Sequence, residues 1–171
     1  MRVDAAQLAA SAGAMMAGNE MTIWDDAMGI ALQAAETAAA DGDVPVGAVV
    51  LNPAGAVIGV GRNEREQLGD PSAHAEIQAI RAACAALENG WRLPGCTLVV
   101  TLEPCAMCAG AIVQSRLQRL VFGAFDAKAG AVSSLWDLVR DPRLNHRVEV
   151  TTGVRAAECE QMLRDFFVKQ R

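Results

Sequence analysis

The sequence predicts one α/β domain of three layers, in which a mixed five-stranded sheet carries helices on both faces. Three observations lead to this fold class. Helix-like and strand-like segments follow one another in the order α-β-β-α-β-α-β-α-β-α. The candidate strands over 46–51 and 56–61 are apolar on successive residues, which is typical of strands covered on both faces. About 24 residues separate the last two strands, which is long for a hairpin and suits a crossover, so these strands should run parallel.

The first half of the chain supplies a helix, a strand hairpin and a second helix. Thr22 is a capping residue with two aspartates soon after it, so the first helix is expected from Thr22 to about Ala40. The segment 52–55 is turn chemistry between two apolar runs. The other expected elements are strands over 46–51 and 56–61, a polar loop over 62–72, and a helix from His74 to about Glu88.

The second half alternates strands with helices. Residues 97–102 form a strand that feeds directly into a helix, with Pro104 at the first helical position, where its missing N–H costs nothing. That helix is expected to end near Ser115. The remaining expected elements are strands over 117–122 and 147–151, a short helical stretch over 135–139, and a final helix over 156–169.

Composition limits the class of protein. The chain has 171 residues, enough to bury a core in one domain without disulfide staples. Hydrophobic residues make up 52% of it and charged residues 20%. The five cysteines lack the spacing of a disulfide framework, which favours a reduced, cytoplasmic compartment. The longest apolar runs are too short to span a membrane.

Charge is distributed unevenly along the chain. The net charge is −5, yet residues 116–171 carry 10 basic and 7 acidic groups, a net +3. A nucleic acid would therefore meet the C-terminal third. Residues 1–20 are rich in alanine and make a poor signal peptide, so we expect a disordered extension before a single domain over 21–171. Met21 would also be a plausible start.

Two short motifs carry the chemistry: His74-Ala75-Glu76 and Pro104-Cys105-Ala106-Met107-Cys108. One histidine and two cysteines are a ligand set that zinc accepts, and three protein ligands leave the fourth position open, as in catalytic sites. Cysteines three apart on a helix present both thiols to one side, in a first turn whose dipole favours thiolates. Zinc held this way lowers the pKa of bound water to about 7. Glu76 need not bind the metal and can carry the proton.

The spacing of His74 and Glu76 also predicts where the second helix begins. Residues two apart point to opposite sides of an ideal helix. We therefore place both residues at a helix entrance, where the chain has not yet become helical. Asp70-Pro71-Ser72, just before them, is turn and cap chemistry.

A structural zinc clip is the alternative for the C-x-x-C pair. It requires a fourth protein ligand, and none of the remaining histidine and cysteines forms a second ligand pair; these are His146, Cys84, Cys96 and Cys159. Two further interpretations stay open: a non-catalytic zinc module that binds RNA, and a subunit that works only with a partner chain. The presence of Glu76 disfavours an inert subunit.

Further strings flank the two motifs. They are Val44-Pro45-Val46-Gly47-Ala48-Val49, Asp70-Pro71, Thr101-Leu102-Glu103, Cys108-Ala109-Gly110-Ala111, Val121-Phe122-Gly123-Ala124, Asp126-Ala127-Lys128 and Asn145-His146-Arg147-Val148-Glu149. The metal motifs alone match the whole superfamily of zinc nucleobase deaminases. With these strings, the chain from about Trp24 to Phe167 resembles the bacterial tRNA-specific adenosine deaminases of the cytidine/deoxycytidylate deaminase superfamily.

The resemblance implies a cytidine-deaminase-like fold, a homodimer and one Zn²⁺ per chain. It implies hydrolysis of adenosine to inosine at the wobble position of an arginine tRNA anticodon, with release of ammonia. The target base would have to be splayed from a loop to reach a buried metal. The site residues implied are the zinc ligands His74, Cys105 and Cys108, the proton shuttle Glu76, and the substrate contacts Asn63, Asp126, Phe166 and Phe167.

The substrate contacts also have plainer interpretations. Asn63 can be a turn residue, Asp126 can cap the segment after it, and paired phenylalanines are more often core than stacking platforms. Two positions depart from the family pattern and remove positive charge near the proposed RNA path: Glu64, where a basic or neutral residue is usual, and Phe125, where arginine is frequent. The competing enzymatic interpretation is a deaminase of free bases or nucleosides, acting on cytosine, guanine or a cytidine nucleotide.

Overall fold

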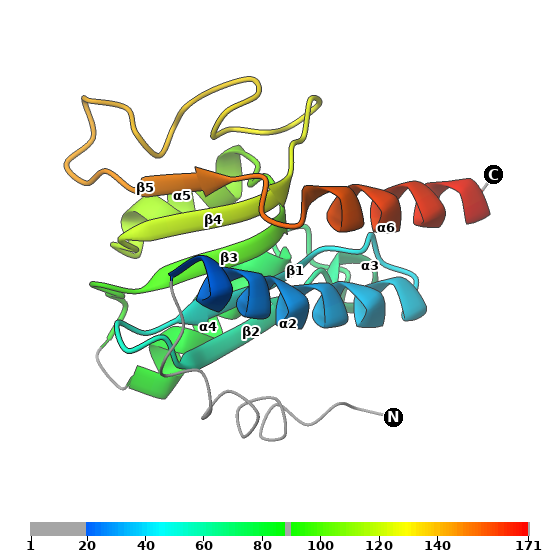
Figure 1. The fold of residues 1–171 in the computed structure, drawn as a ribbon, viewed down its shortest axis with the longest axis horizontal. Coiled ribbons are helices and arrows are strands. Elements are labelled where there is room, and N and C mark those ends of the chain that lie inside the picture. The colour runs from blue at the N-terminus through cyan, green and yellow to red at the C-terminus, as the bar shows by residue number, and fades with distance from the viewer. Residues whose placement is uncertain (1–19, 88–89, 171) are drawn as a thin grey trace.

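A five-stranded sheet in the order β2-β1-β3-β4-β5 forms the centre of the protein (Figure 1). The structure is a computed structural model that describes residues 20–87 and 90–170. The predicted fold class, a mixed five-stranded sheet with helices on both faces, is confirmed. The expected N-terminal extension lies outside the described residues, except that Glu20 begins the first described helix.

Helices and strands alternate much as predicted. The strand over 97–102 and the helix over 156–169 have the predicted bounds. No helix among the described residues combines the length and apolarity that crossing a membrane requires. The helices are α2 (Glu20–Ala40), α3 (Arg65–Leu68), α4 (Ala75–Leu87), α5 (Ala106–Gln114) and α6 (Ala156–Lys169), and the strands are β1 (Gly47–Leu51), β2 (Val57–Arg62), β3 (Thr97–Leu102), β4 (Arg119–Ala124) and β5 (Glu149–Thr152).

The strand directions divide the sheet into two parts. β1 runs antiparallel to both of its neighbours, β2 and β3. β3, β4 and β5 run parallel, and the predicted parallel pairing of the last two strands is confirmed by a register that sets Leu120 opposite Val150. The three parallel strands end at one edge of the sheet, which is where α/β proteins place their ligands.

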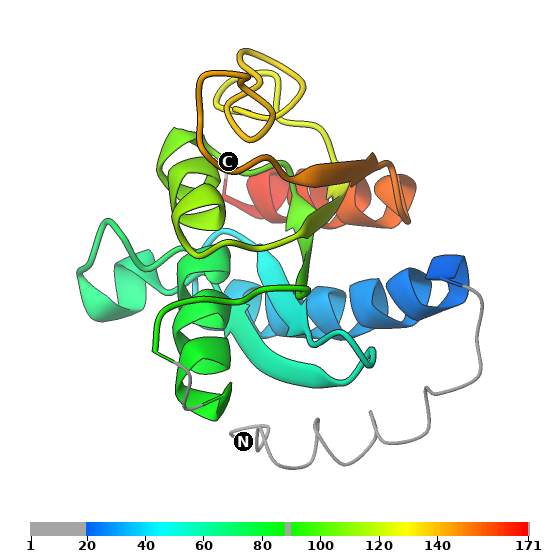
Figure 2. The same ribbon diagram turned by 90° about the vertical axis from the view of Figure 1, so that its left-hand side faces the viewer.

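Alternate strand residues face two different helix layers. On one face, Val49, Val99 and Val121 lie in a cluster with residues of α2 and α6. On the other face, Val50 and Val100 lie in a cluster with residues of α4 and α5. Figure 2 shows the sheet between these two layers. This two-sided burial is the reason that the strands are apolar on successive residues.

Two glycines of β2 let α4 approach the sheet closely. A Cβ at Gly61 would lie 2.2 Å from the carbonyl oxygen of Ala75, and a Cβ at Gly59 would lie 2.4 Å from that of Ala79. A side chain at either position would push the helix away from the strand. Because α4 carries Glu76, this approach fixes how the site's helix sits on the sheet.

Most element bounds differ from the prediction by one or two residues; β5, for example, spans Glu149–Thr152 rather than 147–151. Three differences have a clear local description. α2 begins at Glu20, so Thr22 lies inside the helix and is not its cap. The polar loop over 62–72 contains the short helix α3, which no pattern in the sequence indicated. β4 begins at Arg119 rather than at residue 117, because Arg116 takes a left-handed conformation with φ of 62° and turns the chain after α5.

The short helix predicted over 135–139 is wrong, since the structure has turns and irregular backbone there. The backbone N–H groups of Val132, Ser133 and Ser134 donate to the side chain of Glu103 at 3.1, 2.7 and 2.9 Å. The Leu138 N–H donates to the Ala131 carbonyl at 3.0 Å, which closes a wide turn. The Glu103 carboxylate, distant in the sequence, therefore binds the backbone N–H groups that directly precede the expected helix.

Candidate metal centre and active site

A tight turn delivers His74 to the start of α4. The carboxylate of Asp70 accepts the Ser72 N–H at 2.8 Å and the Ser72 hydroxyl at 2.7 Å, and these hydrogen bonds hold the pKa of Asp70 below its usual range. The His74 carbonyl then accepts the Gln78 N–H at 3.0 Å, so His74 is the residue just before the helix. The predicted helix entrance is confirmed for His74, whereas Glu76 already lies in the first turn of α4. Because His74 is not yet helical, both His74 and Glu76 can line one cavity.

Cys105 and Cys108 lie at the start of α5. Cys105 is the N-cap, with extended φ and ψ of −73° and 175°. Pro104 therefore lies one residue before the cap, and its predicted place at the first helical position is wrong. The reason is tertiary, because Cys105 pairs with Gly130 in an antiparallel bridge and the Pro104 carbonyl accepts the Ala131 N–H at 2.9 Å. These contacts hold the segment extended until Cys105.

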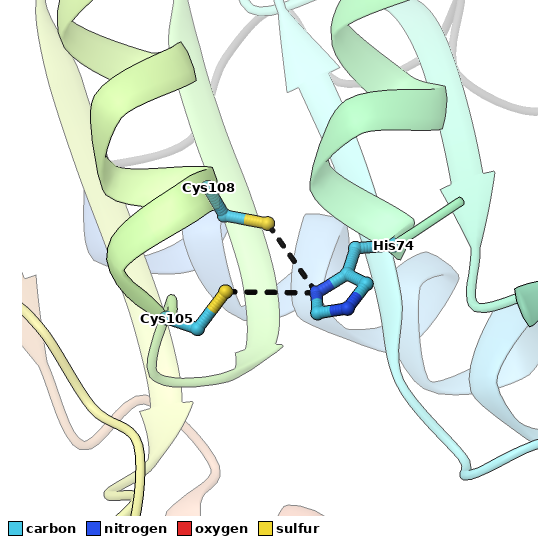
Figure 3. A group of neighbouring side chains, drawn as sticks. All are labelled: His74, Cys105 and Cys108. Carbon is cyan, nitrogen blue, oxygen red and sulfur yellow. Dashed lines mark hydrogen bonds between the residues drawn. The ribbon is translucent and has the colours of Figure 1, made fainter. Parts of the chain in front are cut away.

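The three predicted metal ligands meet in one place (Figure 3). The Sγ atoms of Cys105 and Cys108 lie 3.7 and 3.5 Å from Nδ1 of His74. The three donor atoms all lie within 4.8 Å of one another, and no other group of metal-ligating side chains is found in residues 20–87 and 90–170. One nitrogen and two sulfurs converging this closely suit zinc. The group offers no fourth protein ligand, which speaks against the structural zinc clip.

The two thiols are too close to ionise together unaided. The hydrogen bond from Cys108 lowers the pKa of Cys105 to about 3, and the same hydrogen bond raises the pKa of Cys108. Hydrogen bonding to Cys105 also raises the pKa of His74. A divalent cation is what stabilises the second thiolate and a neutral histidine at once. The donor chemistry therefore fits a zinc ion held by all three side chains.

Glu76 is buried beside these ligands and is 4% exposed. Desolvation raises the pKa of its carboxyl to about 7. A carboxyl with a pKa near neutrality can both accept and donate a proton at working pH, as general acid–base catalysis requires. It lies outside the ligand group, in agreement with the expectation that it does not bind the metal.

A cavity of about 210 Å³ opens beside the metal ligands. Asn63 lines it and donates from Nδ2 to the Val44 carbonyl at 3.1 Å, which fixes the orientation of the amide. The Asn63 Oδ1 is then buried without a partner in the described part of the chain. An unpaired buried acceptor costs about 1–3 kcal/mol, so this atom is available to accept a hydrogen bond from a ligand. The lining is Val44, Val46, Asn63, Arg65, His74, Ala75, Glu76, Leu102, Glu103, Cys105, Asp126 and Ala129.

The other predicted substrate contacts are dispersed. Asp126 lines the cavity, but its Oδ1 accepts the N–H groups of Lys128 and Ala129 at 2.9 and 3.2 Å. Asp126 therefore caps the turn that follows it, which is near the alternative role considered from the sequence, a cap of the segment after it. Phe166 lines a separate groove of about 990 Å³ between α2 and α6, and Phe167 is 50% exposed. Their rings meet edge to face at 5.4 Å. In Figure 1, α6, the helix that carries both residues, extends beyond the arrowhead of β5.

Glu103 is a residue of the site that the sequence analysis missed. Its side chain is 2% exposed and joins the metal-binding segment to the loop that carries Asp126. Burial opposes its charge, but hydrogen bonds from the Ser134 side chain and from the backbone hold the pKa of Glu103 below its usual range. The signal in the sequence that could have indicated this role was a glutamate directly after a buried strand. Its donors are the N–H groups of Asp126, Val132, Ser133 and Ser134 and the Ser134 hydroxyl.

The two departures from the family pattern have local explanations. Glu64 forms an ion pair with Arg62 at 3.0 Å and accepts the Gln78 amide at 3.1 Å, so its charge is partly neutralised. Phe125 is 51% exposed, and its ring meets the buried ring of Phe122 edge to face at 5.2 Å. Neither residue blocks the metal ligands.

Residues 21–124 match the family model of the cytidine and deoxycytidylate deaminase zinc-binding region, and the chain belongs to this family of zinc-dependent deaminases. Over 144 residues it is 51% identical to the tRNA-specific adenosine deaminase of Haemophilus influenzae, covering 84% of this chain and 83% of that protein. The resemblance predicted from the sequence is therefore confirmed.

Solved structures agree with this membership. One, from biochemical and structural studies of A-to-I editing by tRNA:A34 deaminases at the wobble position of transfer RNA, is 43% identical with a TM-score of 0.77 and covers 81% of this chain and 99% of its own. The guanine deaminase from Nitrosomonas europaea is 26% identical with a TM-score of 0.71, covering 98% of this chain and 96% of its own. The cytidine-deaminase-like fold is thus common to relatives with different substrates.

Proposed function

We propose that this chain is a zinc-dependent adenosine deaminase that acts on tRNA and forms inosine at the wobble position of an anticodon. The observation that carries the proposal is the combination of an open three-ligand metal site with the buried acid Glu76 in one small cavity. The substrate is supported by the Haemophilus influenzae relative, which is named a tRNA-specific adenosine deaminase and shares 51% of the aligned residues.

The reaction needs a nucleophilic water and two proton transfers. His74, Cys105 and Cys108 would hold the zinc ion, which when bound would lower the pKa of a water in the cavity. Glu76 takes a proton from that water and passes it to the ring nitrogen N1 while the oxygen adds to C6. Glu76 then carries the second proton to the amine, which leaves as ammonia, so adenosine and water give inosine and ammonia.

The cavity selects an unpaired nucleotide. The free Oδ1 of Asn63 accepts a hydrogen bond from an amine or hydroxyl of the nucleoside, and this hydrogen bond satisfies a buried acceptor. A base can enter the cavity of about 210 Å³ beside the metal ligands only after it has unstacked from the neighbouring bases. An anticodon loop offers such bases with little unpairing cost.

The RNA would extend from the cavity toward α6. Its C-terminal turns carry the partly buried ring of Phe166 and the half-exposed ring of Phe167, and an exposed aromatic ring can stack on an unpaired base. Asp126 contributes through the turn it caps at the cavity wall. These three contacts, and the zinc and proton roles above, are part of the proposal.

Several features of the proposal rest on the resemblance. They are an arginine tRNA as the substrate and a homodimer. A single domain over residues 21–171 and a cytoplasmic location are also part of the proposal, and they rest on the length, composition and cysteine usage of the chain. Light scattering of the purified protein measures the oligomeric state directly, and sequencing of cellular tRNA for inosine identifies the tRNA that is modified.

Deamination of a free base or nucleoside is the second candidate. It is favoured by the likeness to the Nitrosomonas europaea guanine deaminase at a TM-score of 0.71, although the identity there is 26% against 51% for the tRNA-specific relative. Both candidates use the same zinc ligands and the same acid, so the metal centre does not separate them.

Inosine formation by the purified protein tests the proposal. The substrates are an anticodon stem-loop with adenosine at the wobble position, free adenosine, free guanine and free cytidine, each with and without a metal chelator. We expect inosine in the stem-loop, lost with the chelator. Turnover of free guanine or cytidine alone would overturn the proposal in favour of the second candidate.

A further inference from the structure

The cavity lining contains one arginine, Arg65, that the deamination chemistry does not use. It is the only lysine or arginine in the lining, and its side chain is exposed. Within the described part of the chain, Arg65 makes no ion pair. The neighbouring Arg62 differs, because it pairs with Asp41 at 3.2 Å and with Glu64 at 3.0 Å. Arg65 therefore presents an uncommitted guanidinium at the wall of the active-site cavity.

The backbone of Arg65 is fixed, although its side chain has no ion-pair or hydrogen-bond partner in residues 20–87 and 90–170. Asp43 is 1% exposed, and its carboxylate accepts the N–H groups of Glu66 and Gln67 at 2.9 and 3.2 Å. At the other end of α3, the Asp70 N–H donates to the Arg65 carbonyl at 3.2 Å. The buried carboxylate of Asp43 therefore anchors the short surface helix α3 to another segment of the chain. The side chain of Arg65 extends from a fixed backbone position.

We propose that Arg65 binds a phosphate of the RNA backbone next to the adenosine in the cavity. This proposal rests on the proposed function and names the contact that distinguishes a nucleotide in a strand from a free base. A purine base is neutral and offers a guanidinium no counter-charge, whereas every linkage in RNA carries a negative charge. The planar fork of arginine can donate two parallel hydrogen bonds to one phosphate.

The other charges of the lining agree with this assignment. Glu76, Glu103 and Asp126 are acidic and would repel a phosphate. The sugar–phosphate backbone of the RNA must therefore pass the cavity on the side of Arg65, while the base enters toward the metal ligands. The C-terminal third of the chain holds the excess of basic residues, and Arg65 lies outside that third.

Kinetics on the anticodon stem-loop test the assignment. Arg65→Gln is expected to raise KM about tenfold, the low end for a hydrogen bond to a charged group, with kcat unchanged because the contact is the same in the ground and transition states. The dependence of log Kd on log salt should weaken by about 0.7–0.9 for one lost phosphate contact. Arg65→Lys should restore part of the affinity, since it keeps the charge.

The matched control is Arg92→Gln. Arg92 precedes the amino end of β3, away from the edge where the parallel strands end, and stacks on the Trp91 ring at 4.4 Å. It should leave KM, kcat and the salt dependence unchanged. A fall in kcat or in zinc content for Arg65→Gln would indicate a structural role and overturn the proposal.

Neutral linkages in the RNA give the decisive measurement. A methylphosphonate replaces the phosphate on the 5′ or the 3′ side of the target adenosine, one at a time. At one of these linkages the neutral replacement should raise the KM of the wild-type protein by the same factor of about ten, while the KM of Arg65→Gln should not rise further. Equal penalties for both proteins at both linkages would overturn the proposal. If the wild-type protein forms no inosine in any stem-loop, the proposed function fails, and anisotropy binding with the same RNAs still tests Arg65.

Discussion

Glu103→Ala removes one carboxylate that four backbone N–H groups and one hydroxyl share at distances from 2.7 to 3.1 Å for the backbone donors. A buried donor left without a partner costs about 1–3 kcal/mol, so four donors would cost roughly 4–12 kcal/mol if none were rescued. Water from the adjacent cavity can reach part of the gap. We therefore expect a loss of about 4 kcal/mol in the free energy of unfolding, a large part of a typical 5–15 kcal/mol.

Urea unfolding of the zinc-loaded protein measures this loss, and amide hydrogen exchange locates it. Glu103→Gln keeps an oxygen that can accept the N–H groups of Val132, Ser133 and Ser134, but it turns an amide toward the Asp126 N–H, so about half of the loss is expected. Exchange should then speed up at Asp126 first.

Glu149→Ala is the matched control for Glu103→Ala. The Glu149 carboxylate is 60% exposed and pairs with Arg119 at 2.7 Å. Such surface pairs contribute about 0–1 kcal/mol, so this variant should unfold nearly as the wild type does. A loss below about 1 kcal/mol for Glu103→Ala would refute the reasoning, because the four donors would then have found other partners at no cost.

Three further predictions concern the metal centre and its support. Glu76→Gln should lose at least about 10³-fold in inosine formation while metal analysis finds normal zinc, because only the proton carrier is changed; near-normal turnover would remove Glu76 from its role. Cys105→Ala should lose zinc and thermal stability together, since binding energy is also folding energy, whereas Cys84→Ala, outside the ligand group, should keep its zinc; a full zinc complement in Cys105→Ala would exclude it as a ligand. Gly61→Ala should destabilise the protein by about 1–3 kcal/mol in thermal unfolding, because the new carbon would meet the Ala75 carbonyl at 2.2 Å. Gly110→Ala, with nothing within 4 Å of the new carbon, should not lower stability, and equal effects at both glycines would contradict the close packing of α4.

Local chemistry explains why some elements were predictable. The strand over 97–102 consists of β-branched and aliphatic residues, and the final helix over 156–169 is rich in helix formers, so both were placed to the residue. The elements that failed depend on partners far along the chain. α3 is held by Asp43, and Glu103 binds the N–H groups of Val132, Ser133 and Ser134 just before the expected helix over 135–139, in a segment that forms turns.

The sequence by itself determined the metal centre. His74, Cys105, Cys108 and Glu76 belong to two short motifs whose residue types admit little chemistry other than a zinc site with an adjacent acid. The turn that presents His74 is also local, whereas the cap at Cys105 depends on its bridge to Gly130. Only the tertiary structure decided what surrounds that centre. The free acceptor of Asn63, the loop held by Glu103 and the uncommitted Arg65 are defined by contacts across 19 to 31 residues of chain. Burial and hydrogen-bond partners at such separations follow from how the layers pack, which no local pattern encodes.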